Sequence, residues 1–146
     1  MKAKETAIVF IEFQNDFCKE KGALYGGVKD QIKAQNTVKN AQDCIQKARG
    51  KCLTLLVPIL FEQDYADAGC EGVLGPIHGN VMQTKAFRKG TWGGEIIDEL
   101  KPTKQDIVVE GKRTLDAFNS TNLDFLLRVN SLTNVAFCAF LTNVSA

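Results

Sequence analysis

Three polar side chains stand where apolar stretches of this sequence end, and together they have the types needed for nucleophilic hydrolysis. Glu12 closes the first apolar run, Lys112 follows a short run at 106–110, and Ser145 follows the last run. A carboxylate can act as a base, an ammonium can hold it and stabilise developing negative charge, and a hydroxyl can attack. Glu12, Lys112 and Ser145 are therefore candidate catalytic residues.

Each of these residues also has a plainer explanation. A buried carboxylate is costly unless it is paired, so Glu12 and Lys112 could form a purely structural ion pair. A serine in a polar tail such as TNVSA is most often solvated. The residue types alone leave both explanations open.

Four apolar runs of strand length, with helical patterns between them, must position these side chains. Apolar runs that are short and continuous predict strands buried on both faces, as in a parallel sheet. The alternation with helices predicts an α/β fold in one domain, 1–146. Carboxyl ends of parallel strands meet at one edge, so the three candidates should share a pocket. The strands are expected at 6–13, 51–60, 106–110 and 133–141, the helices at 28–49, 95–100 and 122–129, and loops at 14–27 and 61–94.

The totals exclude several classes of protein. The net charge is +1, with 18 basic and 17 acidic residues, so no nucleic-acid partner is expected. No apolar run reaches the roughly 18 residues that a membrane span needs. The five cysteines are odd in number and form no C-x-x-C, which fits reduced thiols in a cytoplasmic protein. The single histidine, His78, lies in a predicted loop without partner histidines, so we expect no metal and no cofactor.

Two aromatic residues on predicted loops near strand ends, Phe17 and Trp92, are candidates to line a substrate pocket. Packing in the core or at an interface is an equal alternative for Trp92. Cys138 lies within the fourth apolar run, which favours a small buried hydrophobe over a nucleophile.

Four segments in order resemble the isochorismatase-like family of cysteine hydrolases. They are AIVFIEFQNDF at 7–17, GTWGGEIIDELKP at 90–102, VVEGKRTLDAFNSTNLDFLLR at 108–128 and VAFCAFLTNVSA at 135–146. The resemblance implies a Rossmann-like three-layer α/β/α fold and a triad of Asp, Lys and Cys. It also implies hydrolysis of small amides, ureides or related metabolites.

The triad of this family falls on Glu12, Lys112 and Ser145, and the oxyanion donors on the backbone of Leu141 and Ser145. Glu in place of Asp adds a methylene, and a serine hydroxyl is harder to activate than a thiol, whose free pKa is about 8.5. The family's zinc-binding members use histidine in a segment that is LFEQDYADAG here, which again predicts no metal.

The family chain also continues with a helix that carries the nucleophile, so this chain looks truncated after its fourth predicted strand. An uncovered sheet face predicts association, most simply a homo-oligomer. We expect an impaired hydrolase acting on a small-molecule substrate. The alternative is a non-catalytic relative that binds or oligomerises.

Overall fold

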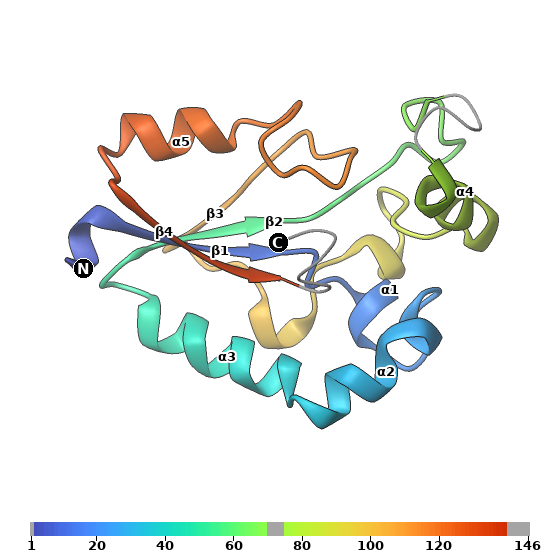
Figure 1. Ribbon diagram of the computed structural model, residues 1–146, viewed down its shortest axis with the longest axis horizontal. Coiled ribbons are helices and arrows are strands. Elements are labelled where there is room, and N and C mark those ends of the chain that lie inside the picture. The colour runs from blue at the N-terminus through green and yellow to red at the C-terminus, as the bar shows by residue number, and fades with distance from the viewer. Residues whose placement is uncertain (1, 70–74, 140–146) are drawn as a thin grey trace.

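Four parallel strands form the centre of the molecule (Figure 1). The computed structural model describes residues 2–69 and 75–139. The strands are β1 (Thr6–Ile11), β2 (Leu53–Val57), β3 (Asp106–Val108) and β4 (Asn134–Ala139), in the order β3-β2-β1-β4. All three neighbouring pairs are parallel, with Ala7 of β1 opposite both Leu53 and Val135. The predicted parallel α/β sheet is confirmed, although β1, β2 and β3 are shorter than their apolar runs.

Helices cover both faces of this sheet. In β1, Phe10 packs on the side of α3 (Thr37–Ala48), while Val9 and Ile11 pack on the side of α5 (Leu123–Val129). Figure 1 shows α5 on one side of the sheet and α3 on the other. Strand side chains alternate between faces, so the nearly continuous apolar run of β1 supplies both cores. The expected three-layer arrangement is therefore present.

The helix predicted at 28–49 is two helices, and that prediction is wrong in its continuity. Helix α2 spans Tyr25–Ala34 and α3 begins at Thr37, with Asn36 between them at φ 48°. Asparagine tolerates this left-handed backbone conformation, so the chain can turn there. A further short helix, α1 (Asn15–Cys18), lies in the segment expected to be a loop.

The segment 61–94 is also more ordered than its sequence suggested. Helix α4 (Gly75–Thr84) contains His78, which was expected in a loop, and a 3₁₀ turn, η2, spans Trp92–Gly94. Aromatic and aliphatic side chains of this segment form a core of their own, which includes Phe61, Tyr65 and Phe87. The helix predicted at 95–100 is only a 3₁₀ turn, η3 (Asp98–Leu100). A 3₁₀ turn, η1 (Ala3–Glu5), precedes β1.

Strand β3 is anchored by a buried carboxylate at its start. The Asp106 side chain is fully buried and accepts hydrogen bonds from Arg49, Thr54 and Thr103. Burial by itself would raise the pKa of Asp106, but the hydrogen bonds from Arg49, Thr54 and Thr103 outweigh it and hold that pKa below its ordinary value. This network ties the end of α3 to β2 and β3.

No helix within residues 2–69 and 75–139 has the length and apolarity to cross a bilayer.

Candidate active site

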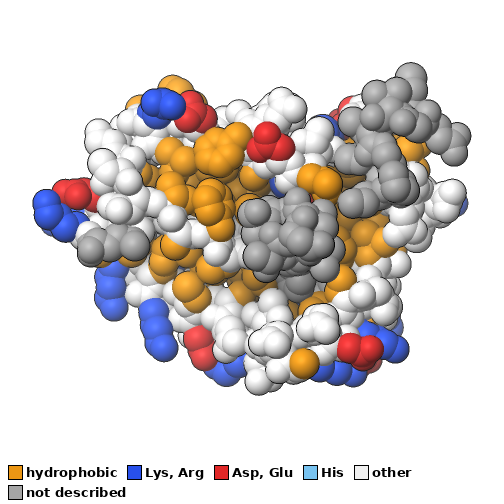
Figure 2. Space-filling view, viewed as in Figure 1, with side chains coloured by type: hydrophobic (Ala, Val, Ile, Leu, Met, Phe, Trp, Pro, Cys, Tyr) orange, Lys and Arg blue, Asp and Glu red, His pale blue; other side chains and the backbone are white. Residues whose placement is uncertain are grey.

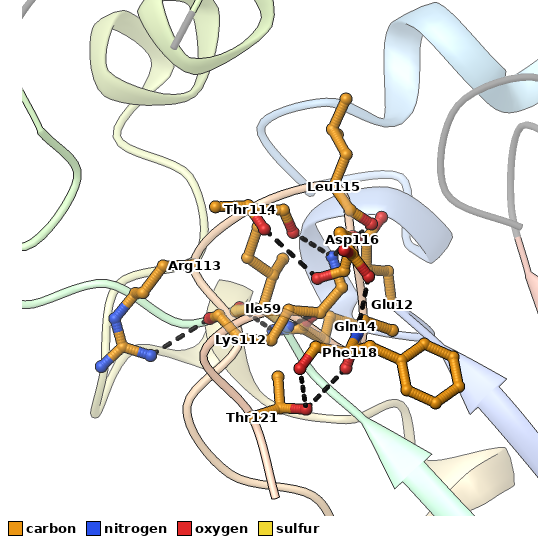
Figure 3. A network of polar contacts seen from close by, with 11 residues as sticks. Glu12, Gln14, Ile59, Lys112, Arg113, Thr114, Leu115, Asp116, Phe118 and Thr121 are labelled. Carbon is orange, nitrogen blue, oxygen red and sulfur yellow. Dashed lines mark hydrogen bonds and ion pairs between the residues drawn. The ribbon is translucent and has the colours of Figure 1, made fainter. Parts of the chain in front are cut away.

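A buried ion pair lies at the carboxyl edge of the sheet (Figure 3). Lys112 Nζ is 2.6 Å from Glu12 Oε1, although the two residues are 100 positions apart in the chain. Lys112 is fully buried and Glu12 is 3% exposed. Glu12 directly follows β1, and Lys112 follows β3 by four residues. The structure thus brings together two of the three candidate catalytic side chains, while their catalytic roles stay predictions.

The three donors of the Lys112 ammonium are all engaged within its own loop and with Glu12. Besides the carboxylate, Nζ donates to the backbone carbonyls of Thr114 and Leu115, the latter at 3.2 Å. An ammonium has only three N–H groups, so none remains for another partner in this arrangement. Lys112 therefore fixes Glu12 and places a positive charge beside it, instead of reaching outward.

The backbone of Glu12 turns sharply at the end of β1. Its φ is 61°, a left-handed conformation that is uncommon for a residue with a side chain. The Glu12 amide donates to the Val57 carbonyl at 3.0 Å, and its carbonyl accepts from the Gln14 amide at 2.8 Å. Strained backbone of this kind, held by surrounding hydrogen bonds, concentrates at functional sites. The turn lets the chain leave the sheet while the Glu12 carboxylate stays at the Lys112 ammonium.

Gln14 holds the turn against two other segments. Its side-chain amide donates to the carbonyls of Ile59 and Gly94, both at 2.8 Å, and its oxygen accepts from the Ile59 amide at 2.9 Å. The side chain is completely buried. It therefore joins the ends of β1 and β2 to the turn at η2, and it positions the peptide next to Glu12.

The next two residues, Asn15 and Asp16, have a similar bridging function. Asn15 Nδ2 donates to the Trp92 carbonyl at 2.7 Å. The buried Asp16 carboxylate accepts from the amides of Ala23 and Phe87, at 3.0 and 2.7 Å. The loop predicted at 14–27 gave no indication of these roles. The available signal was an amide and a carboxylate placed directly after a buried strand.

The two candidate pocket residues, Phe17 and Trp92, differ in burial and surroundings. Phe17, in α1, is half-buried, and its ring centroid is 5.0 Å from that of Phe87. Trp92, in η2, has 48% of its surface exposed. A role for either in binding substrate stays a prediction.

Ser145 and Leu141 lie outside the described residues, so the third catalytic candidate and both oxyanion donors also stay predictions.

Cys138, in β4, is an unsuitable replacement for the nucleophile. Burial, with a smaller contribution from Cys44, raises the pKa of the Cys138 thiol to about 12, so little thiolate forms at neutral pH. The thiol packs against the core that contains Phe10, but it is half-buried and not fully buried as the sequence had indicated.

Two adjoining cavities, of about 430 and 690 Å³, lie on the β3 side of the sheet. Both contact Pro58, Leu60 and Val108, and the larger one extends to Arg113 in the loop that follows Lys112. Neither is lined by Glu12 or Lys112.

Within the two described ranges, no group of three or more His, Cys, Asp or Glu side chains could hold a metal ion. The absence of a metal stays a prediction.

The fold and the pair define a Rossmann-like α/β domain with a polar site at the carboxyl edge of its parallel sheet. Residues 6–145 match the model of the isochorismatase domain, and the chain belongs to this family. The family resemblance inferred from the four sequence segments is thereby confirmed.

Several curated relatives are ureidoacrylate amidohydrolases. The enzyme of Rhizobium rhizogenes is 31% identical over 154 aligned residues, which cover 99% of this chain and 62% of the relative. The enzyme of Agrobacterium fabrum is also 31% identical and is covered to 67%. The chain thus spans about two thirds of the length of these relatives.

Solved structures show the same fold. A cysteine hydrolase from Pseudomonas syringae pv. phaseolicola superposes with a TM-score of 0.80 at 26% identity, covering 99% of this chain and 63% of the other. N-carbamoylsarcosine amidase from Thermoplasma acidophilum superposes with a TM-score of 0.72 at 25% identity, covering 97% and 70%.

Proposed function

We propose that this chain is a hydrolase for a small amide, ureide or related C–N compound. The observation that carries the proposal is the buried Glu12–Lys112 pair at the carboxyl edge of the sheet. Membership of the isochorismatase family supports it, as do relatives named for amidohydrolase and amidase activity.

In this proposal Glu12 is the base. Its carboxylate takes the proton of the Ser145 hydroxyl as the oxygen attacks the substrate carbonyl carbon, and backbone amides at Leu141 and Ser145 stabilise the oxyanion. The proton passes to the departing nitrogen, and water then hydrolyses the acyl-enzyme. Lys112 holds the carboxylate in place, because its three donors bind Glu12 and the two loop carbonyls.

Serine at position 145 sets the expected rate. A hydroxyl has a far higher pKa than a thiol, so Glu12 must remove its proton during attack instead of finding a thiolate already formed. We therefore infer an impaired hydrolase. This serine is also the observation that favours the second candidate function, a non-catalytic family relative that binds a small molecule or oligomerises.

Replacing the nucleophile distinguishes the two functions. Ser145→Cys should raise turnover of amide and ureide substrates by at least about 100-fold if the pocket is otherwise complete. Glu12→Gln in the Ser145→Cys background should remove the gain, because the base is lost while the side-chain shape is kept. A Ser145→Cys protein that binds substrates but gains no activity contradicts the hydrolase proposal.

Covalent trapping provides the second test. An electrophilic amide analogue should form an adduct on Ser145, located by mass spectrometry, and Ser145→Ala should abolish that adduct. Adduct formation excludes the non-catalytic alternative. Tight binding without an adduct or turnover would favour the alternative.

A further inference from the structure

Two thiols from different elements lie together on the α3 side of the sheet. Cys44 is in α3 and Cys138 is in β4, and both pack against the core that contains Phe10 and Ile45. The register of the sheet explains the position of Cys138. It is opposite Phe10 of β1, and residues paired across neighbouring strands point to the same face. Because Phe10 packs on the side of α3, Cys138 does so as well.

The helical spacing of α3 brings Cys44 to the same place. Ala41 and Ile45 are buried residues of α3 that belong to this core. Residues three apart on a helix are neighbours on its surface, so Cys44 lies beside Ala41 at the border of the buried stripe. The Cys44 and Cys138 side chains interact there through a hydrogen bond. Two described cysteines that are far apart in the chain are therefore adjacent in the fold.

The surroundings of the two thiols are apolar. Figure 2 shows the side of the molecule on which β4 lies toward the viewer, as in Figure 1. Hydrophobic side chains, with cysteine counted among them, fill much of its central area, and most charged side chains lie toward the outline. Burial raises the pKa of Cys138 to about 12, with a smaller contribution from Cys44. Cys138 therefore keeps its proton at neutral pH, and the first oxidation step falls to Cys44.

We propose that Cys44 and Cys138 form a reversible disulfide when the protein is exposed to hydrogen peroxide. The Cys44 sulfur attacks one peroxide oxygen, which gives a sulfenic acid at Cys44 and one water. The Cys138 sulfur then attacks the sulfenic sulfur. The S–S bond forms, the S–O bond breaks, and the hydroxide leaves as a second water with the Cys138 proton. Two electrons pass from the sulfurs to the peroxide, and a thiol reductant such as dithiothreitol returns them.

The fold favours this bond over any other pairing that needs unfolding. A disulfide requires Cα atoms roughly 4.4–6.8 Å apart, so cysteines on distant elements cannot join without large backbone movement. The hydrogen-bonded thiols already face each other across one packed layer. Closing the bond needs rotation of the two side chains and a small approach of α3 to β4. The disulfide does not depend on the hydrolase activity proposed above.

Peptide mapping of the full 146-residue chain tests the proposal. The reduced protein is desalted, treated with hydrogen peroxide at mildly alkaline pH, blocked with N-ethylmaleimide in urea and digested without reductant. We expect a cross-linked pair of peptides that carry Cys44 and Cys138, which dithiothreitol separates. The cross-link closes a loop of about 90 residues and so restricts the unfolded chain, which should raise the urea midpoint of the oxidised protein by about 1 M.

Single substitutions supply the controls. Cys44→Ser and Cys138→Ser should each abolish the cross-link and the rise in midpoint. Cys52→Ser should keep both, although Cys52 is half-buried like Cys44. Cys18 should be recovered as a free thiol, because it is buried, its pKa is raised to about 12, and the neighbours that act on that pKa are not thiols.

Three results would overturn the proposal. The first is a peroxide-treated native protein without the link between Cys44 and Cys138. The second is a link that forms as readily in urea as in the native protein, since the fold would then not bring the sulfurs together. The third is a link between two chains in place of the link within one, which non-reducing electrophoresis detects.

Discussion

Removing one partner of the Glu12–Lys112 pair should destabilise the protein at least as much as removing both. In Lys112→Met the Glu12 carboxylate, 3% exposed, loses the ammonium 2.6 Å away, and the carbonyls of Thr114 and Leu115 lose a donor. Breaking a buried pair in this way costs about 3–5 kcal/mol. Glu12→Gln should cost a similar amount, because it leaves the ammonium unpaired. The total stability of a domain is only about 5–15 kcal/mol, so each loss is a large fraction of it.

The double variant Glu12→Gln/Lys112→Met separates the pair from its surroundings. With no charge left in the site, its cost should be no greater than that of either single variant, which gives a coupling of at least about 3 kcal/mol. Urea unfolding measures this: with a slope of about 1–3 kcal/mol/M, each single variant should lower the midpoint by about 2 M.

An exposed ion pair supplies the control for this cycle. Arg128 and Asp124 on α5 are joined at 2.8 Å, but their side chains are 78% and 55% exposed. Arg128→Met should leave the urea midpoint almost unchanged, because water screens the pair. If Lys112→Met costs as little as Arg128→Met, or if the two single variants simply add in the double variant, the buried pair is not the coupled unit described above.

Three further predictions concern Gln14, Gly93 and Asp106. Gln14→Leu removes three buried hydrogen bonds and should cost about 2–4 kcal/mol by urea unfolding, with substrate turnover falling as well if this side chain positions the site. Gly93→Ala would place a Cβ 2.3 Å from the Asp16 carboxylate and should cost about 1–3 kcal/mol by urea unfolding. Gly26→Ala in α2, where a Cβ meets nothing within 4 Å, should be neutral or stabilising in the same measurement. Hydrogen bonds hold the pKa of Asp106 below its unfolded value of about 3.9 despite burial, so the stability it contributes is present above about pH 4 and is lost as the pH falls toward the lower native value. The free energy of unfolding, measured between pH 7 and pH 3, should therefore fall less steeply with decreasing pH in Asp106→Asn than in the wild type. An unchanged slope would contradict this role of Asp106.

The sequence by itself determined the layers of the fold and the need of Glu12 for a cation. Apolar runs such as 6–13 lack a polar face, so they can only lie in a sheet covered on both sides, as β1 is. A carboxylate at the end of such a run requires a partner, since burial of an unpaired charge is costly. These conclusions follow from composition and local periodicity, which report burial directly.

The strand ends already indicated Lys112, among 18 basic residues, as the partner of Glu12, and only the tertiary structure decided how that pair is held. Lys112 lies 100 positions away, and the donors that saturate it are backbone carbonyls, which no side-chain pattern encodes. The helix break at Asn36 depends on a single left-handed residue within an otherwise continuous amphipathic pattern. The edge-to-face contact of Phe118 with Phe137 likewise joins a loop to a strand. In each case the deciding contacts join distant segments, and packing between elements selects them after local propensity has formed the elements themselves.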